Sequence, residues 1–167
     1  MNIEIRPVAN HEVEEIAALA RDIWQQHYTP MIGQAQVDYM LAQRYNKPRL
    51  IEELDRVGIW WDQLLVDGTR AGFASYHLTG VPGEMKLDKL YIHPAQQRRG
   101  LGGALITHVA DQARAQHCDS LILAVNKQNS QAIAAYQKHG FVVRESVQVD
   151  IGQGFVMDDY IMVKSLH

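Results

Sequence analysis

Residues 95–105, AQQRRGLGGAL, place two arginines and three glycines directly before an apolar run with helical spacing. Apolar residues recur at steps of four from Leu101 to Ala113, which predicts a helix that begins near Gly100. The first backbone N–H groups of a helix have no intrahelical partner, and the helix dipole places partial positive charge there. Glycines also let a ligand approach the main chain closely. The stretch therefore suits a phosphate group, and a glycine-softened turn with solvated arginines is the alternative.

The segments on both sides of this stretch predict strands. Residues 121–125 form an uninterrupted apolar run, which is typical of a buried parallel strand. Residues 84–92, EMKLDKLYI, have the composition of a strand, but their apolar positions change parity after Leu87. Either one extra residue near Asp88 forms a β-bulge, or the strand is buried on both faces. In both cases strand, glycine turn, helix and strand follow in the order of a βαβ unit.

The rest of the chain alternates between helical and strand patterns. An amphipathic helix is expected from Asn10, a candidate N-cap, and a second helix fades before Pro48. The first helix has apolar residues at helical spacing at Val13, Ile16, Ala17, Ala20 and Trp24. The other predicted elements are a strand at residues 3–7, a hairpin of residues 59–66 and 71–78 across Asp67-Gly68, a short helix that Asn129 can cap and that closes at Gly140, and a hairpin of residues 141–149 and 155–163. We therefore expect one α/β domain over residues 1–167. Its mixed sheet is antiparallel at both ends, with a central parallel strand pair flanked by helices.

The composition is that of an ordinary globular domain. Of the 167 residues, 47% are hydrophobic, and 16 Lys and Arg against 19 Asp and Glu give a net charge of -3. This balance argues against a general nucleic-acid binder. The N-terminus has no basic segment before an apolar run, and no membrane-spanning apolar stretch occurs, so we expect a cytoplasmic protein without a membrane partner. The single cysteine, Cys118, is expected to be a small buried thiol.

Two common phosphate-binding motifs do not fit the glycine stretch. The Walker loop requires G-x-x-x-x-G-K-[ST], and the chain contains no such run. The dinucleotide fingerprint requires a third small residue at the position of Leu105. A pyrophosphate ligand of another kind is therefore expected.

Two segments resemble the GNAT superfamily of acetyl-coenzyme A-dependent N-acyltransferases. Residues 97–102, QRRGLG, match the motif Gln/Arg-x-x-Gly-x-Gly/Ala that this superfamily places between a strand and a helix. Residues 129–141, NSQAIAAYQKHGF, look like its second motif, N-x-x-A-x-x-x-Y-x-K-x-G-F. The predicted order of elements also agrees from residue 3 to residue 163. The ending of the chain, IGQGFVMDDYIMVKSL, more weakly resembles bacterial acetyltransferases grouped with polyamine acetylators.

The resemblance implies a site for acetyl-coenzyme A (acetyl-CoA). The main chain of the glycine stretch would hold the pyrophosphate, and the strand before it would pair with the pantetheine arm and the thioester carbonyl. Side-chain amides on the neighbouring elements would pair with the arm, and a lysine would reach the phosphates. The residues implied are Leu90, Tyr91 and Ile92 on the strand, Gln97, Arg98, Arg99, Gly100, Leu101, Gly102 and Gly103 in the loop, and Asn126, Asn129, Tyr136 and Lys138 beyond it.

Acetyl transfer to an amine needs a neutral amine, a polarised carbonyl and a proton for the departing thiolate. Tyr136 matches the tyrosine that supplies this proton in the superfamily. The base is less defined: Asp88 lies on the strand near the cofactor, and Asp158 or Asp159 lies on the last strand. Such a carboxylate acts directly, through water, or as an electrostatic anchor. The eight histidines show no metal-binding pattern, so we predict no metal.

The acceptor is expected to be a small cationic primary amine, such as a polyamine. Trp24, Tyr28 and Tyr39 would form an aromatic wall for it, because ring faces attract cations, and ordinary packing of each ring in the core is the alternative. Strand alternation sends Asp158 and Asp159 to opposite faces, so only one of them, which we take to be Asp159, lines the pocket.

Other functions and assemblies remain open from the sequence. The alternatives are a non-catalytic acetyl-CoA-binding regulatory domain and an acetyltransferase that acts on peptide or protein N-termini. A nucleotide-binding module ranks below them, because both of its motifs are missing. A homodimer is compatible with the sequence and is left open.

Overall fold

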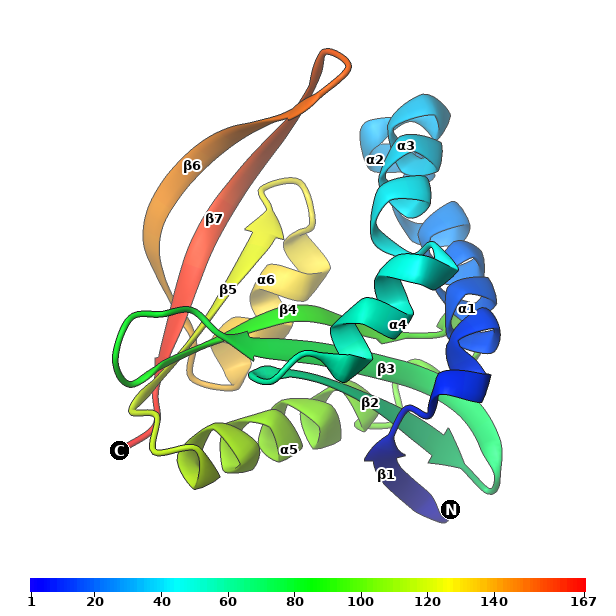
Figure 1. Ribbon diagram of the computed structural model, residues 1–167. Coiled ribbons are helices and arrows are strands. Elements are labelled where there is room, and N and C mark those ends of the chain that lie inside the picture. Colours follow the sequence, from blue (N-terminus) through cyan, green and yellow to red (C-terminus); the bar gives the residue numbers. More distant parts are fainter. The chain divides into compact units, whose positions relative to one another are not determined.

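The computed structural model describes residues 1–167 as a mixed β-sheet with helices (Figure 1). The strands follow the order β1-β2-β3-β4-β5-β7-β6, with β4 and β5 parallel. The elements are β1 (Ile3–Pro7), η1 (Asn10–Glu12), α1 (Val13–His27), α2 (Thr29–Ile32), α3 (Gln34–Arg44), α4 (Lys47–Asp55), β2 (Ile59–Val66), β3 (Thr69–Leu78), β4 (Glu84–Ile92), η2 (Pro94–Gln96), α5 (Leu101–Ala115), β5 (Ser120–Asn126), α6 (Ser130–Lys138), β6 (Val142–Gly152) and β7 (Phe155–Ser165). The predicted mixed sheet with a central parallel pair is confirmed.

Two compact units divide the chain. The first contains residues 1–77 and 89–105, and the second contains residues 78–88 and 106–167. The boundaries fall within β3, β4 and α5, so each of these elements contributes to both units. None of the helices is both long and apolar enough to cross a membrane.

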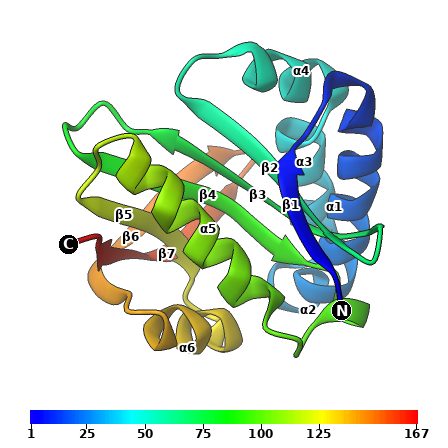
Figure 2. The ribbon, with the colours of Figure 1, turned by 90° about the horizontal axis from the view of Figure 1, so that it is seen from below.

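In the first unit, β1 and β3 pair with β2 on its two sides, both antiparallel (Figure 2). Asp67 and Gly68 connect β2 to β3 with φ angles of 49° and 83°, as a two-residue hairpin turn requires. The hairpin predicted from these two residues is therefore confirmed. Its tight turn sets the register in which Val66 pairs with Thr69.

Helix α1 buries the apolar positions that the sequence spacing predicted, including Val13, Ile16 and Trp24. The prediction that Asn10 caps this helix is wrong. Asn10 is the first residue of η1, and α1 has no side-chain cap. The Glu12 carboxylate instead accepts a hydrogen bond from the backbone N–H of Ala9 at 3.0 Å. The same carboxylate accepts a hydrogen bond from the Gln63 side chain of β2 at 2.9 Å, and the α-helix begins at the next residue, Val13.

Helix α4 was missed by the sequence analysis, which ended the helical region before Pro48. Pro48 lies in the first turn of α4, where its missing N–H costs nothing because that group has no intrahelical partner. Asn46 caps this helix by accepting a hydrogen bond from the N–H of Arg49 at 2.9 Å. On the buried side of α4, the Glu53 carboxylate accepts a hydrogen bond from the Trp61 indole at 3.0 Å.

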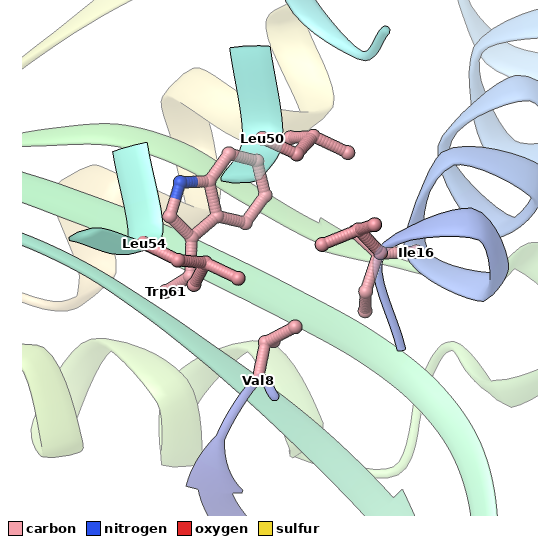
Figure 3. Close-up of a pocket in the computed structure, with 6 residues that line it drawn as sticks. Val8, Ile16, Leu50, Leu54 and Trp61 are labelled. Carbon is pink, nitrogen blue, oxygen red and sulfur yellow. The ribbon is translucent and has the colours of Figure 1, made fainter. Parts of the chain in front are cut away.

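A small apolar hollow lies between α1, α4 and β2 (Figure 3). Its lining includes Ile16 from α1, Leu50 and Leu54 from α4, Trp61 from β2, and Val8. It has no room even for a water molecule. The hollow is therefore part of the packed core and carries no ligand.

In the second unit, β5 lies between β4 and β7, and β6 pairs with the far side of β7. The β6–β7 hairpin is the long pair of strands at the C-terminal end in Figure 1. Its strands extend further than predicted, because Asp150, Ile151 and Gly152 continue β6 in place of a five-residue loop. The chain therefore turns only at Gln153 and Gly154.

Strand β4 is covered on both faces. Met85, Leu87 and Lys89 are buried at a period of two residues, and Leu90 and Ile92 of the opposite parity are half-buried. Of the two alternatives that the sequence left open, this pattern favours a strand buried on both faces. The bulge near Asp88 stays a prediction.

Candidate active site

The N-terminus of α5 offers unpaired backbone N–H groups. Ala104 makes the first bond of this helix, from its N–H to the Gly100 carbonyl at 3.1 Å, so the N–H groups of Leu101, Gly102 and Gly103 precede the intrahelical ladder. Gly100 has a φ of +76°, which favours glycine. A Cβ added to Gly102 would meet no atom within 4 Å. The main chain is therefore open to a ligand here, and its donors and dipole fit a pyrophosphate group.

Positive charge accompanies this helix end. Arg98 and Arg99 are both exposed, and the guanidinium of Arg99 donates to the Gln96 side chain at 3.1 Å. The side-chain amide of Gln97 donates to the Ile92 carbonyl at 3.3 Å and so links the loop to the end of β4. The cationic loop and the strand end that the sequence assigned to the cofactor thus belong to one connected segment of the first unit.

Two of the three predicted aromatic wall residues lie beside β4. The ring of Tyr91 lies 5.8 Å from the Trp24 ring and 6.0 Å from the Tyr28 ring, measured between centroids. The rings of Trp24 and Tyr28 are themselves 4.6 Å apart, because Tyr28 is the C-cap of α1 and residues four apart lie on one side of a helix. Tyr39 lies on α3, where its hydroxyl accepts a hydrogen bond from Gln43 at 2.8 Å. Trp24 and Tyr28 therefore stand next to the strand segment expected to hold the thioester.

Lys89 is a residue of this region that the sequence analysis missed. Its side chain is only 3% exposed, and its amino group lies 5.0 Å from the centre of the Trp61 ring and 5.8 Å from that of Tyr45. Lysine is rarely buried, so the residue type alone does not point to this position. The signal that could have found it is its parity with Tyr91 in β4, which places both side chains on one face.

In the second unit, Tyr136 lies on α6 and is half-buried. Its ring makes an edge-to-face contact with Phe141, with centroids 5.5 Å apart, and its carbonyl accepts from the Phe141 N–H at 3.0 Å. These two contacts orient the phenol ring. Lys138 lies in the last turn of the same helix and is exposed.

The two predicted asparagines shape the connection from β5 to α6. The side-chain oxygen of Asn126 accepts from the Gln128 N–H at 2.8 Å, and that of Asn129 accepts from the Ala132 N–H at 3.3 Å. Asn129 is thus the N-cap of α6, as the sequence predicted. Both amide oxygens serve the local fold, so a cofactor contact from Asn126 would use its amide nitrogen.

The two neighbouring aspartates of β7 have different surroundings. Asp158 pairs with Lys127 at 2.7 Å and half of its side chain is exposed, whereas Asp159 is only 4% exposed. Asp159 pairs in register with Asn126 of β5. The third candidate carboxylate, Asp88, is half-buried on β4. Of the two β7 aspartates, only Asp159 points into the protein, as strand alternation predicts.

The remaining side chains do not favour a cysteine nucleophile or a metal site. Cys118 is buried, and burial together with the negative charge of Asp119 raises the pKa of its thiol, so it is a poor nucleophile. No three His, Cys, Asp or Glu side chains gather into a group that could hold a metal ion. The groups that the sequence assigned to the chemistry stay predictions: the backbone N–H groups of α5 and the Tyr136 phenol as donors, and the carboxylates of Asp88 and Asp159 as acceptors.

Comparison with known proteins identifies the family. Residues 16–141 match the acetyltransferase (GNAT) family. The chain belongs to the GNAT family. GNAT proteins transfer an acetyl group from acetyl-CoA, so this GNAT protein is an acetyl-CoA-dependent N-acetyltransferase, as its two sequence motifs predicted.

Individual relatives of this GNAT protein differ in their acceptors. It is 25% identical over 162 residues to a spermidine N(1)-acetyltransferase of Thermoplasma acidophilum, covering 95% of this chain and 97% of the relative. It is 37% identical over 79 residues to the ribosomal protein bS18 alanine N-acetyltransferase of Escherichia coli, which covers 47% of this chain and 52% of the relative. The crystal structure of the PaiA N-acetyltransferase of Thermoplasma acidophilum with coenzyme A has the same fold, with a TM-score of 0.86, 24% identity and 99% coverage of both chains.

Proposed function

We propose that this protein acetylates the primary amine of a small cationic molecule by direct attack in a ternary complex with acetyl-CoA. The observation that carries the proposal is the group of rings formed by Trp24, Tyr28 and Tyr91. Tyr91 belongs to the strand segment that we assign to the thioester, so the rings stand where an acceptor amine would enter. Ring faces attract an ammonium group by about 0.5–2 kcal/mol.

A relative supports an amine of this kind. The spermidine N(1)-acetyltransferase of Thermoplasma acidophilum aligns with 95% of this chain, including the α1 and α3 region outside the cofactor motifs. Of the two β7 aspartates in the second unit, Asp159 is buried and Asp158 is paired with Lys127, so we propose Asp159 as the carboxylate that pairs with a cationic acceptor. The similarity to a spermidine acetyltransferase and the carboxylate of Asp159 both favour a cationic amine as the acceptor.

The side chains have distinct proposed roles in the transfer. Acetyl-CoA supplies the acetyl group as a thioester. The neutral amine forms the new C–N bond as the C–S bond breaks, and the amine proton passes to a carboxylate, for which Asp88 is our candidate. Tyr136 donates the proton that the departing sulfur needs. The main chain of Leu90, Tyr91 and Ile92 positions the reacting carbonyl.

A peptide or protein N-terminus is the second candidate acceptor. It is supported by the 37% identity to the ribosomal protein bS18 alanine N-acetyltransferase, which covers 47% of this chain. That shorter alignment carries less weight for the acceptor than one spanning the whole chain. The third alternative, a non-catalytic acetyl-CoA-binding domain, is disfavoured because the chain belongs to a family of acetyltransferases.

An acceptor screen tests the proposed function. Release of free coenzyme A thiol is measured with acetyl-CoA and a panel of diamines, polyamines, amino acids, aminoglycosides and peptides with free N-termini. We expect diamines and polyamines to give the highest kcat/KM. A higher kcat/KM for peptides would replace the small-amine proposal with the N-terminal one.

A further inference from the structure

We infer that His93 is a positioning residue for the cofactor loop, which it links to helix α1 through Asp22. This inference rests on the proposed assignment of residues 97–103 to the pyrophosphate, and it is independent of the acceptor. His93 directly follows β4 and precedes η2, so it stands at the entry of the loop.

Both ring nitrogens of His93 are engaged. Nδ1 accepts a hydrogen bond from the Ala95 N–H at 3.1 Å, and Nε2 lies 3.2 Å from the Asp22 carboxylate. Because Nδ1 acts as an acceptor, the ring proton sits on Nε2 and is donated to Asp22. A single tautomer thus caps η2 and binds α1 at the same time.

Apart from the bond of Gln97 to Ile92 at the end of β4, no other side chain of residues 93–100 is hydrogen-bonded to another element of the first unit. The backbone N–H of His93 donates to the Ala71 carbonyl of β3 at 2.8 Å. The remaining bonds of the segment are local, such as those from Gln97 to Ile92 and from Arg99 to Gln96. The residues from Ala95 to Gly100 are mostly exposed. The orientation of the loop therefore depends on His93 more than on any other side chain.

Helix α1 touches the end of β4 and the residue that follows it. Trp24 contacts the Tyr91 ring, and Asp22, two residues earlier in α1, binds His93, the first residue after β4. The helix that carries the proposed acceptor wall thus also holds the entry of the cofactor loop. Without the Asp22 bond the loop entry gains freedom, and coenzyme A must order it on binding, which weakens its affinity.

Variants can break this bond from either end. Asp22→Ala removes the acceptor and leaves the cap of η2 in place. His93→Asn keeps a side-chain oxygen for the Ala95 N–H but is too short to reach Asp22. Asp22→Asn is the conservative control, because its amide oxygen still accepts from Nε2. Coenzyme A affinity is measured by titration calorimetry, with the midpoint of thermal unfolding as a check on the fold.

We expect Asp22→Ala and His93→Asn each to weaken coenzyme A binding by about two- to fivefold, the range for a partly exposed pair. The double variant should be no weaker than either one, and Asp22→Asn should bind as the unmodified protein does. Unchanged affinity in Asp22→Ala, or effects that multiply in the double variant, would overturn the inference. A lower unfolding midpoint with unchanged affinity would also overturn it, because the pair would then be only structural.

A further variant separates this inference from the cofactor assignment on which it rests. Gly102→Asp places a carboxylate at the proposed pyrophosphate site. If Gly102→Asp leaves coenzyme A affinity unchanged, the assignment of residues 97–103 fails and the inference about His93 fails with it. If Gly102→Asp weakens binding but Asp22→Ala does not, only the inference fails.

Discussion

Gly72 on β3 lies so close to Tyr91 on β4 that a Cβ added to the glycine would be 2.5 Å from the Tyr91 carbonyl oxygen. The same Cβ would be 2.6 Å from the Ile92 side chain. Only glycine therefore allows β3 to approach β4 this closely. The close contact fixes the main chain of the segment that we assign to the thioester. We predict that Gly72→Ala lowers the free energy of unfolding by about 1–3 kcal/mol, the usual cost of overpacking.

Urea denaturation measures this loss, and titration with coenzyme A measures the effect on the site. Because Tyr91 and Ile92 must shift, we expect weaker coenzyme A binding as well. Gly102→Ala is the matched control for stability, since a Cβ there has nothing within 4 Å. A Gly72→Ala variant as stable as the unmodified protein would show that β3 and β4 can separate at no cost.

Gly102→Asp should weaken coenzyme A binding without destabilising the fold. A carboxylate in the first turn of α5 interacts favourably with the helix dipole, but it would repel a pyrophosphate held by the same N–H groups. We expect at least about a tenfold loss of affinity, roughly 1.4 kcal/mol, by titration calorimetry. Gly102→Ala adds only a methyl group and shows how much of the loss is steric. Equal affinity for Gly102→Asp and the unmodified protein would rule out the loop as the pyrophosphate site.

Tyr136→Phe should slow turnover and leave coenzyme A affinity unchanged. The variant removes only the phenolic O–H and keeps the edge-to-face contact with Phe141. Loss of an acid catalyst lowers kcat by about ten- to a thousandfold, which thiol release at saturating substrates would measure. If kcat is unchanged when chemistry limits the rate, Tyr136 does not supply the proton.

Asp159→Asn should raise KM for a cationic amine by about tenfold, because the variant removes the charge of the carboxylate that we propose as the partner of the amine. Asp158→Asn is the matched control: it changes the neighbouring residue, whose side chain is half exposed and paired with Lys127. We expect little change in KM from the control. Steady-state kinetics with a diamine measures both, and equal KM values for the two variants would place Asp159 outside the acceptor site.

Glu12 should make the stability of the protein depend on pH. Burial alone would raise the pKa of its carboxyl, but hydrogen bonds from Ala9 and Gln63 and the charges of Arg6 and Arg70 hold the pKa below the ordinary value of 4.5. The folded state therefore favours the carboxylate. Its contribution to stability is fully present above the unfolded pKa and is lost as the pH falls through the lower folded pKa.

We predict that Glu12→Gln lowers the free energy of unfolding at pH 7 by about 1–3 kcal/mol, the cost of leaving buried donors unsatisfied. The difference from the unmodified protein should shrink below about pH 4.5. Glu14→Gln, at an exposed ion pair with Lys47, is the control and should change stability by less than about 1 kcal/mol. A pH-independent difference would mean that the charge of Glu12 contributes nothing.

Local sequence patterns predicted the parts of the fold that short segments specify. The steps of four from Leu101 predicted α5, and Asp67-Gly68 predicted the hairpin between β2 and β3. Asn129 was expected to cap α6, and it does. Each of these features depends on a few neighbouring residues, because helix periods, turn conformations and caps are local interactions.

Errors arose where a local signal had two meanings. Pro48 was taken as the end of a helical region, but proline is equally suited to a first turn, and the buried contacts of Leu50 and Glu53 decide for α4. Asn10 is a residue type that is common at N-caps, but the hydrogen bonds that Glu12 accepts from Ala9 and Gln63 set where α1 begins. Tertiary packing overrode the local preference at both positions.

The sequence by itself determined the βαβ order, the helix entry at Gly100 and the motifs of a GNAT acetyltransferase, because these depend on residues close together in the chain. Only the tertiary structure decided the approach of Gly72 to Tyr91, the burial of Lys89 among aromatic rings and the bond from Asp22 to His93. Asp22 and His93 are 71 residues apart, and no periodicity or motif spacing in the sequence predicts a contact over that separation. It arises only when α1 packs against the end of β4, where burial and hydrogen bonding select partners across the chain.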